Sequence, residues 1–97
     1  MAFGDLAIDP TSREVRRAGQ VVRLTPKEFD VLVLLAAHPR RVFTRIEILE
    51  ELWDFAFDGD PSTVTVHVRR LREKLEDEPS RPRRLMTVWG AGYRFEP

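Results

Sequence analysis

A narrow apolar stripe in the second half of the chain constrains its fold more than any other feature. The stripe repeats at spacings of four, three and four residues, which is the period of a helix that buries one face. Its members are Val64, Val68, Leu71 and Leu75. Asp60 and Pro61 precede it as a cap and a first-turn proline, and Pro79 follows it. We therefore predict a helix over about residues 61–77 whose stripe packs on a core.

The face opposite the stripe is polar and basic. At about 100° per residue, the outward positions are Ser62, Val66, Arg69, Arg70 and Glu73. The flanking positions are Thr63 and Lys74 on one edge, with Thr65 and Arg72 on the other. Such a helix fits the DNA major groove, where Arg70 can pair with a guanine and Val66 can touch a thymine methyl. Arg69 and Arg72 can hold phosphates, although an Arg-rich face that is merely solvated is the alternative interpretation.

The charge is unevenly distributed along the chain. The 97 residues carry a net charge of zero, which by itself argues against a nucleic-acid partner. Residues 46–60, however, hold six acids and no Lys or Arg, whereas residues 62–74 hold four bases and one acid. Further bases follow at Arg81, Arg83 and Arg84. A neutral total can therefore conceal one basic face that meets phosphates.

Residues 3–24 have the pattern of a small antiparallel sheet. Leu6 and Ile8 alternate with small or polar neighbours, as in a half-buried strand. Residues 18–20 include a glycine and lie between apolar residues, which favours a hairpin turn. We expect the sheet to end near Leu24.

Two helix starts of the same kind follow the sheet. Residues 25–28 and 44–47 both have the Thr-x-x-Glu pattern of a capping box. The first helix is expected to bury Phe29, Leu32, Leu35 and Ala36. It should end at His38, because the residue before a proline is pushed out of the helical region. The apolar stripe expected for the second helix comprises Ile46, Leu49, Leu52 and Trp53, opposite an acidic face, and residues 55–59 should form a loop.

The end of the chain has the pattern of a β-hairpin over residues 84–95, with its turn at residues 90–92. A helix-turn-helix beside a basic hairpin is typical of winged DNA-binding domains. The arginines that could meet flanking DNA backbone are Arg81, Arg83, Arg84 and Arg94. Val88, Tyr93 and Phe95 could instead simply complete the core. The hairpin can both contact DNA and complete the core, because alternate residues of a strand face opposite ways.

Taken together, these patterns resemble the C-terminal effector domain of OmpR/PhoB-type response regulators. The resemblance runs from about Leu6 to Phe95, and its matching stretches are residues 24–29, 41–45, 62–75 and 87–95. It implies an α+β fold, a winged helix-turn-helix with an N-terminal four-stranded antiparallel sheet, three helices and a C-terminal hairpin wing. It also implies sequence-specific binding of promoter DNA by a bacterial two-component regulator. The third helix would enter the major groove, and the wing would reach an adjacent minor groove.

The resemblance also implies roles for individual residues. By position, Val66 and Arg70 correspond to base contacts. The positions that correspond to backbone contacts are Ser62, Thr63, His67, Arg69, Arg72, Tyr93 and Trp53, and those of the wing are Thr87, Trp89 and Arg94. Two positions differ from the family pattern, since Ser62 and Trp89 stand where arginines are frequent. Trp89 brings no charge, so we expect it to pack either on DNA sugars or back onto the domain, with the second favoured.

Several partners follow from the resemblance. The loop at residues 54–60 is expected to meet RNA polymerase, and the DNA site is expected to be a direct repeat. Residues 1–97 would form one domain, and the receiver or other input domain of the phosphorelay would lie outside this chain. No cofactor, metal or membrane is expected, and the expected location is the cytoplasm.

Two other function classes compete with DNA binding. An enzyme is disfavoured because the chain has no cysteine, no metal-spaced histidine pair, no nucleophile motif and no Gly-rich phosphate loop. A winged helix that binds protein is the remaining alternative. It would use the acidic second helix and the loop after it, with the Arg-rich helix solvated. Charge reversal at Arg70 would separate this alternative from DNA binding.

Overall fold

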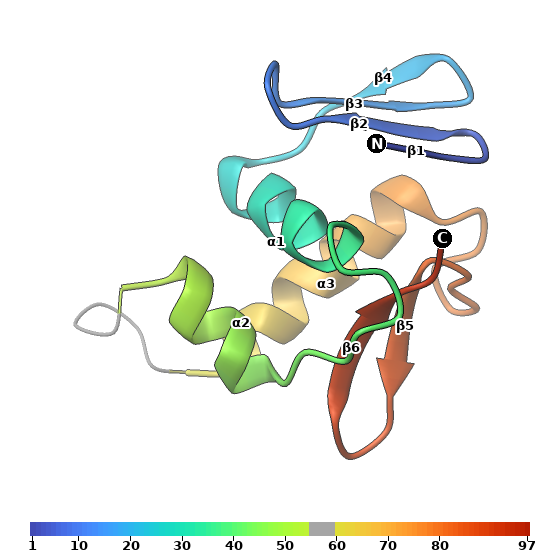
Figure 1. Ribbon diagram of the computed structural model, residues 1–97. Coiled ribbons are helices and arrows are strands. Elements are labelled where there is room, and N and C mark those ends of the chain that lie inside the picture. Colours follow the sequence, from blue (N-terminus) through green and yellow to red (C-terminus); the bar gives the residue numbers. More distant parts are fainter. Residues whose placement is uncertain (55–59) are drawn as a thin grey trace.

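The computed structural model describes residues 1–54 and 60–97, which fold into a four-stranded sheet, three helices and a C-terminal hairpin (Figure 1). The elements are β1 (Ala2–Phe3), β2 (Leu6–Asp9), β3 (Glu14–Arg17), β4 (Gln20–Val22), α1 (Pro26–Ala36), α2 (Arg45–Leu52), α3 (Ser62–Leu75), β5 (Leu85–Val88) and β6 (Gly92–Phe95). The sheet and the hairpin lie on opposite sides of α1 and α3. This arrangement confirms the predicted α+β winged-helix architecture.

The N-terminal sheet is an antiparallel meander with the strand order β1-β2-β3-β4. Leu6, Ile8 and Val15 are buried on its inner face, as the alternation predicted. Ala18 and Gly19 both have positive φ, 50° and 79°, in the two-residue loop that joins β3 to β4. Positive φ at both central residues matches the twist of a tight hairpin, so the predicted turn is confirmed.

Both predicted capping boxes are present. The Thr25 hydroxyl accepts from Glu28 N at 3.2 Å, and the Glu28 carboxylate accepts from Thr25 N at 2.9 Å. Thr44 and Glu47 repeat this exchange at 3.0 and 2.9 Å. Each pair satisfies backbone donors that the first turn of a helix leaves open, so α1 and α2 begin where the sequence predicted.

The predicted core face of α2 is wrong at one position. Ile46 is 47% exposed, whereas Ile48 is fully buried beside Leu49. The expected stripe joined Ile46 to Trp53 by helical spacing. Trp53, however, is the C-cap and has extended angles (φ −118°, ψ 152°), so that spacing does not apply to it. The buried face therefore centres on Ile48, Leu49 and the partly buried Leu52.

Helix α3 is seated by its predicted stripe, whose four members Val64, Val68, Leu71 and Leu75 are all buried. The helix packs against α1 and α2. It spans residues 62–75, slightly less than the predicted 61–77. Pro61 already has helical angles (φ −59°, ψ −19°), and the Asp60 carboxylate accepts from Ser62 N at 2.9 Å. Asp60 therefore supports the first turn, but the N-cap is Pro61 and not Asp60 as the sequence predicted, because α3 begins at Ser62.

The end of α3 is held by a buried carboxylate that no sequence pattern indicated. Glu76 accepts hydrogen bonds from three backbone N–H groups, those of Arg83, Arg84 and Leu85, at 2.9–3.3 Å. These bonds turn the chain from the helix into β5. The hairpin therefore starts at a fixed position relative to α3.

The hairpin, called the wing below, pairs β5 with β6 from Leu85↔Phe95 to Val88↔Gly92, which confirms the predicted hairpin. An antiparallel bridge joins it to the segment before α2, where Phe43 and Tyr93 exchange backbone hydrogen bonds at 2.8 and 2.9 Å. Gly92 makes this approach possible, because a Cβ there would lie 2.0 Å from Phe43 O. The wing is thus a braced element and not a free arm.

The buried acceptor at the end of α3 gives a stability prediction. Glu76→Ala leaves three N–H groups without their acceptor and should lower the free energy of unfolding by about 2 kcal/mol. Urea denaturation followed by circular dichroism measures this. The matched control, Glu78→Ala, removes an exposed carboxylate and should stay within about 0.5 kcal/mol of the parent chain. Equal stabilities for the two variants would contradict the role of Glu76.

Candidate nucleic-acid interface

The outward face of α3 is the part of the molecule with the chemistry of a DNA-reading surface. Val66, Arg69 and Arg70 are all exposed, as predicted. Arg70 makes no hydrogen bond or ion pair with any residue in the described ranges 1–54 and 60–97. Arg69 has one loose ion pair, with Glu73 at 3.8 Å. Both guanidinium groups are therefore available to a ligand.

The four bases of α3 divide into two kinds. Arg69 and Arg70 point to solvent, whereas Arg72 and Lys74 are partly buried and hydrogen-bonded to other elements. Lys74 Nζ donates to the Glu28 carboxylate at 2.6 Å. The basic face is therefore narrower than the sequence alone suggested.

Glu28 is a buried carboxylate with two structural roles. Besides capping α1, it holds Lys74 of α3, which the sequence did not indicate. Burial alone would raise the pKa of Glu28, but the hydrogen bonds from Lys74 and from Thr25 N outweigh it and lower the pKa. The ionised pair thus fastens α3 to the start of α1.

Arg72 joins α3 to the wing. Its Nε donates to Leu85 O at 3.0 Å and its Nη2 donates to Thr87 Oγ1 at 2.6 Å. The guanidinium also lies over the Tyr93 ring, with its central carbon 5.6 Å from the ring centroid. Burial lowers the pKa of Arg72 below its usual range. Three residues predicted to face DNA thus contact one another, and we call Arg72, Thr87 and Tyr93 the latch.

A second group of predicted residues gathers where α2 ends. The Trp53 and His67 rings meet edge to face with centroids 5.1 Å apart, and His67 Nδ1 lies 2.7 Å from Thr63 O. Lys27 adds a hydrogen bond to Leu52 O and lies 5.2 Å above the Trp53 ring. Lys27 was not among the predicted site residues, because no local pattern brings α1 to the end of α2.

The tip of the wing carries Trp89, and here one prediction is wrong. The side chain is 91% exposed, so it does not pack back onto the domain. Trp89 follows the last residue of β5 and lies in the turn closed by the bond from Ala91 N to Val88 O. That turn extends beyond the core, and among residues 1–54 and 60–97 no second layer covers the indole. Arg94, on the return strand, lies 3.4 Å from the Glu96 carboxylate.

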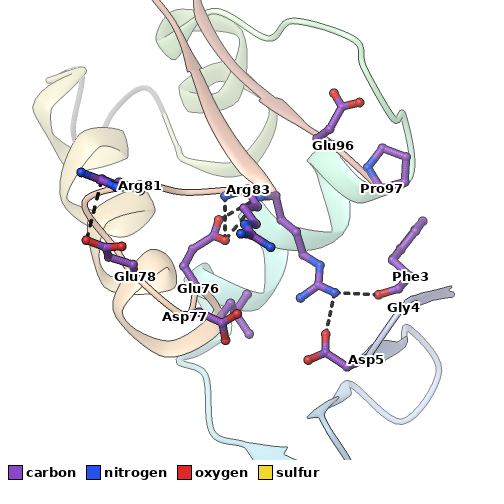
Figure 2. A pocket seen from close by; sticks show the side chains of 12 residues that line it. Phe3, Gly4, Asp5, Glu76, Asp77, Glu78, Arg81, Arg83, Glu96 and Pro97 are labelled. Atoms are coloured by element: carbon purple, nitrogen blue, oxygen red, sulfur yellow. Dashed lines mark hydrogen bonds and ion pairs between the residues drawn. The ribbon is translucent and has the colours of Figure 1, made fainter.

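The arginines before the wing lie along a groove of about 630 Å³ at the other end of α3 (Figure 2). Arg84 was expected near DNA, but its Nη2 donates to Phe3 O at 2.9 Å and to Asp5 at 2.6 Å. Arg81 lies 3.9 Å from Glu78. Two of the three arginines therefore pair with acids that line the same groove, and Arg84 ties β5 to the N-terminal sheet.

The predicted polymerase-contacting loop at residues 54–60 falls mostly on residues 55–59, which lie outside the described residues. Asp60, at the end of this loop, has a lowered pKa, chiefly because its carboxylate accepts a hydrogen bond from Ser62 N.

Within residues 1–54 and 60–97, no cluster of three potential metal ligands occurs. In the same ranges, no helix is long and apolar enough to cross a bilayer.

Known proteins share this sequence and fold. A family model described as "Transcriptional regulatory protein, C terminal" matches residues 19–95. The DNA-binding response regulator MtrA of Mycolicibacterium smegmatis is 45% identical over 97 residues, which are all of this chain and 42% of that protein. The chain thus spans about two fifths of the length of this curated relative.

Two solved structures are similar throughout. The Thermotoga maritima response regulator DrrB, an OmpR/PhoB homologue, has a TM-score of 0.93 at 40% identity, over 100% of this chain and 44% of that one. The Klebsiella pneumoniae RstA DNA-binding domain, in complex with the RstA box, has a TM-score of 0.89 at 38% identity, over 99% of this chain and 95% of that one. These relatives are transcriptional regulators. The chain therefore belongs to the family of C-terminal domains of transcriptional regulatory proteins, with the winged-helix fold of the OmpR/PhoB type.

Proposed function

We propose that this chain is the sequence-specific DNA-binding effector domain of a bacterial response regulator. The observation that carries the proposal is the seating of α3, whose buried stripe turns Val66, Arg69 and Arg70 outward. The relatives support it, since MtrA is named a DNA-binding response regulator and the RstA domain was solved with its DNA box. We propose that α3 lies in the major groove, which is wide enough for a helix.

In this arrangement Val66 and Arg70 contact base edges. Arg70 has an exposed guanidinium with no partner among the described residues, so it can donate two parallel hydrogen bonds to a guanine. Val66 is 42% exposed and offers a methyl surface to thymine. Because backbone contacts alone carry no sequence information, these two side chains would supply the direct readout.

Phosphate contacts would flank the reading face on both sides. On the side of α2, the proposed contacts are Trp53, Thr63 and His67, which already pack together. Ser62 and Arg69 would contact phosphates from α3 itself, and Tyr93 would contact them from the side of the wing. Thr87, Trp89 and Arg94 would face DNA from the wing. Contacts on both sides would fix the register of the helix in the groove.

We give Arg72 a modified role. Two of its nitrogens are already bound to β5, so we propose that it acts on DNA binding by positioning the wing. The direct phosphate contact that the resemblance implies stays a prediction, and the second experiment below distinguishes the two.

The remaining partners are proposed from the resemblance to effector domains of response regulators. The chain would act as one winged-helix unit, attached to a receiver or other input domain in a cytoplasmic two-component regulator. Two copies on a direct repeat would gain affinity by linkage. The acidic segment at residues 54–60 would meet RNA polymerase.

The first test is charge reversal at the proposed base contact. Duplex selection should enrich one motif, and fluorescence anisotropy should show Arg70→Glu binding it at least about a hundredfold more weakly, because a bidentate contact and a favourable charge are both lost. Arg23→Glu is the matched control, since Arg23 is exposed beyond β4 and carries the same charge. If no motif is enriched and Arg70→Glu changes nothing, the proposed function is wrong, and the acidic face of α2 becomes the surface to test for a protein partner.

The second test compares two arginines of α3. Arg72→Met should weaken binding about tenfold and lower the free energy of unfolding by about 1–3 kcal/mol, because the latch is broken. The slope of log affinity against log salt should stay unchanged. Arg69→Met should instead reduce that slope by about 0.9, as expected for one lost phosphate contact, with little effect on stability. A slope reduced by Arg72→Met would favour the direct phosphate contact.

A further inference from the structure

One nitrogen of the His67 ring makes a hydrogen bond that fixes the position of the ring proton. Nδ1 lies 2.7 Å from the backbone oxygen of Thr63, one turn earlier in α3. A carbonyl oxygen only accepts hydrogen bonds, so Nδ1 must carry the proton. A neutral imidazole has a single N–H, so Nε2 of the neutral ring holds a lone pair and cannot donate. The neutral form of His67 therefore has no N–H left for a ligand.

The other ring nitrogen, Nε2, is open to solvent. It makes no hydrogen bond with any residue in the ranges 1–54 and 60–97, and in the same ranges no buried side-chain nitrogen or oxygen lacks a partner. Because His67 is only partly buried, its Nε2 must therefore reach the surface. The edge-to-face contact with Trp53 holds the ring in this orientation. A ligand at the end of α2 thus meets a nitrogen that accepts when the ring is neutral and donates when it is charged.

The elements that pack around His67 carry charges of both signs. Lys74 binds Glu28 at 2.6 Å, and Lys27 lies 5.2 Å above the Trp53 ring. Burial raises the pKa of Glu28, whereas Lys74 and Thr25 N lower it together with a smaller contribution from the charge of His67. The charged groups are Lys27 and Glu28 of α1, Asp54 directly after Trp53, and Arg70 and Lys74 of α3. Three of these five are positive, so they do not favour a charged ring, whereas a DNA phosphate beside Nε2 would favour it.

We propose that DNA binding takes up one proton at His67, so that only the charged ring contacts the phosphate. This inference rests on the proposed function, which puts a DNA phosphate beside Trp53, Thr63 and His67. A lone pair on Nε2 repels a phosphate oxygen, whereas the N–H of the charged ring donates a charge-assisted hydrogen bond. The proton comes from solvent and binds Nε2, and no other bond changes. Histidine ordinarily changes its charge between pH 5 and 8, so the DNA affinity of this chain responds to pH within that range.

Anisotropy titrations at two pH values test this proton uptake. The parent chain should bind the selected duplex about fivefold more tightly at pH 6 than at pH 8, because the complex holds a proton that the free chain lacks at high pH. The slope of log affinity against log salt should be steeper at pH 6 by up to about 0.9, since one more phosphate is neutralised. A phosphate carries no sequence information, so an unrelated duplex should show the same ratio of affinities between the two pH values.

Two variants assign the effect to His67. His67→Gln keeps an N–H donor that does not titrate, so its affinity should be equal at pH 6 and pH 8. His38→Gln removes the other histidine of the chain and is the matched control, which should retain the pH dependence of the parent. A pH dependence that survives in His67→Gln, or disappears in His38→Gln, would overturn the inference.

The protonation state of the ring supplies an independent readout. Long-range ¹H–¹⁵N NMR spectra should show the neutral ring of His67 protonated on Nδ1 in the free chain at pH 8, and both nitrogens protonated once the duplex is bound at pH 6.5. If the neutral proton lies on Nε2, or if the parent binds the duplex equally well at both pH values, the inference is wrong while the proposed function stands. A parent chain that binds no duplex at either pH defeats both.

Discussion

The burial of one face of α3 is the constraint on which the rest of the structure depends. Val64, Val68, Leu71 and Leu75 are each almost fully buried, and a side chain of this kind contributes roughly 1.5–3 kcal/mol on burial. Even one such contribution is large beside the net 5–15 kcal/mol that typically separates folded from unfolded domains. Because the helix has a fixed period, burying this stripe also fixes its rotation. Val66, Arg69 and Arg70 then have no position other than the outer surface.

Polar contacts then fix the neighbours of α3 in place. Glu28 and Lys74 fasten it to α1, Glu76 fixes the turn into β5, and Arg72 holds the wing. Half of the basic residues on the helix are therefore structural, and the other half face solvent. This division explains how a chain with no net charge can still present the proposed DNA-reading surface: many of its acids pair with bases elsewhere or lie on α2.

The predictable features are those that local rules determine. The capping boxes at Thr25 and Thr44, the glycine-containing turns and the stripe of α3 each depend on residues within a few positions, and each is confirmed. Features that depend on distant neighbours were not predictable. Arg84 reaches Asp5 across 79 positions, and Glu76 accepts from backbone that only the fold brings near. Trp89 was misplaced because its turn extends beyond the core, and no local rule showed that Ile48 and not Ile46 lies on the buried face of α2.

The most direct measurement is an NMR titration of the ¹⁵N-labelled chain with its selected duplex. If α3 reads the major groove and the wing lies beside it, backbone amide shifts should change along residues 62–73 and 87–92. The sheet β1–β4 should stay unaffected apart from small uniform changes. Shifts confined to α2 and residues 47–54, with α3 unperturbed, would contradict the account and identify the acidic face as the binding surface instead.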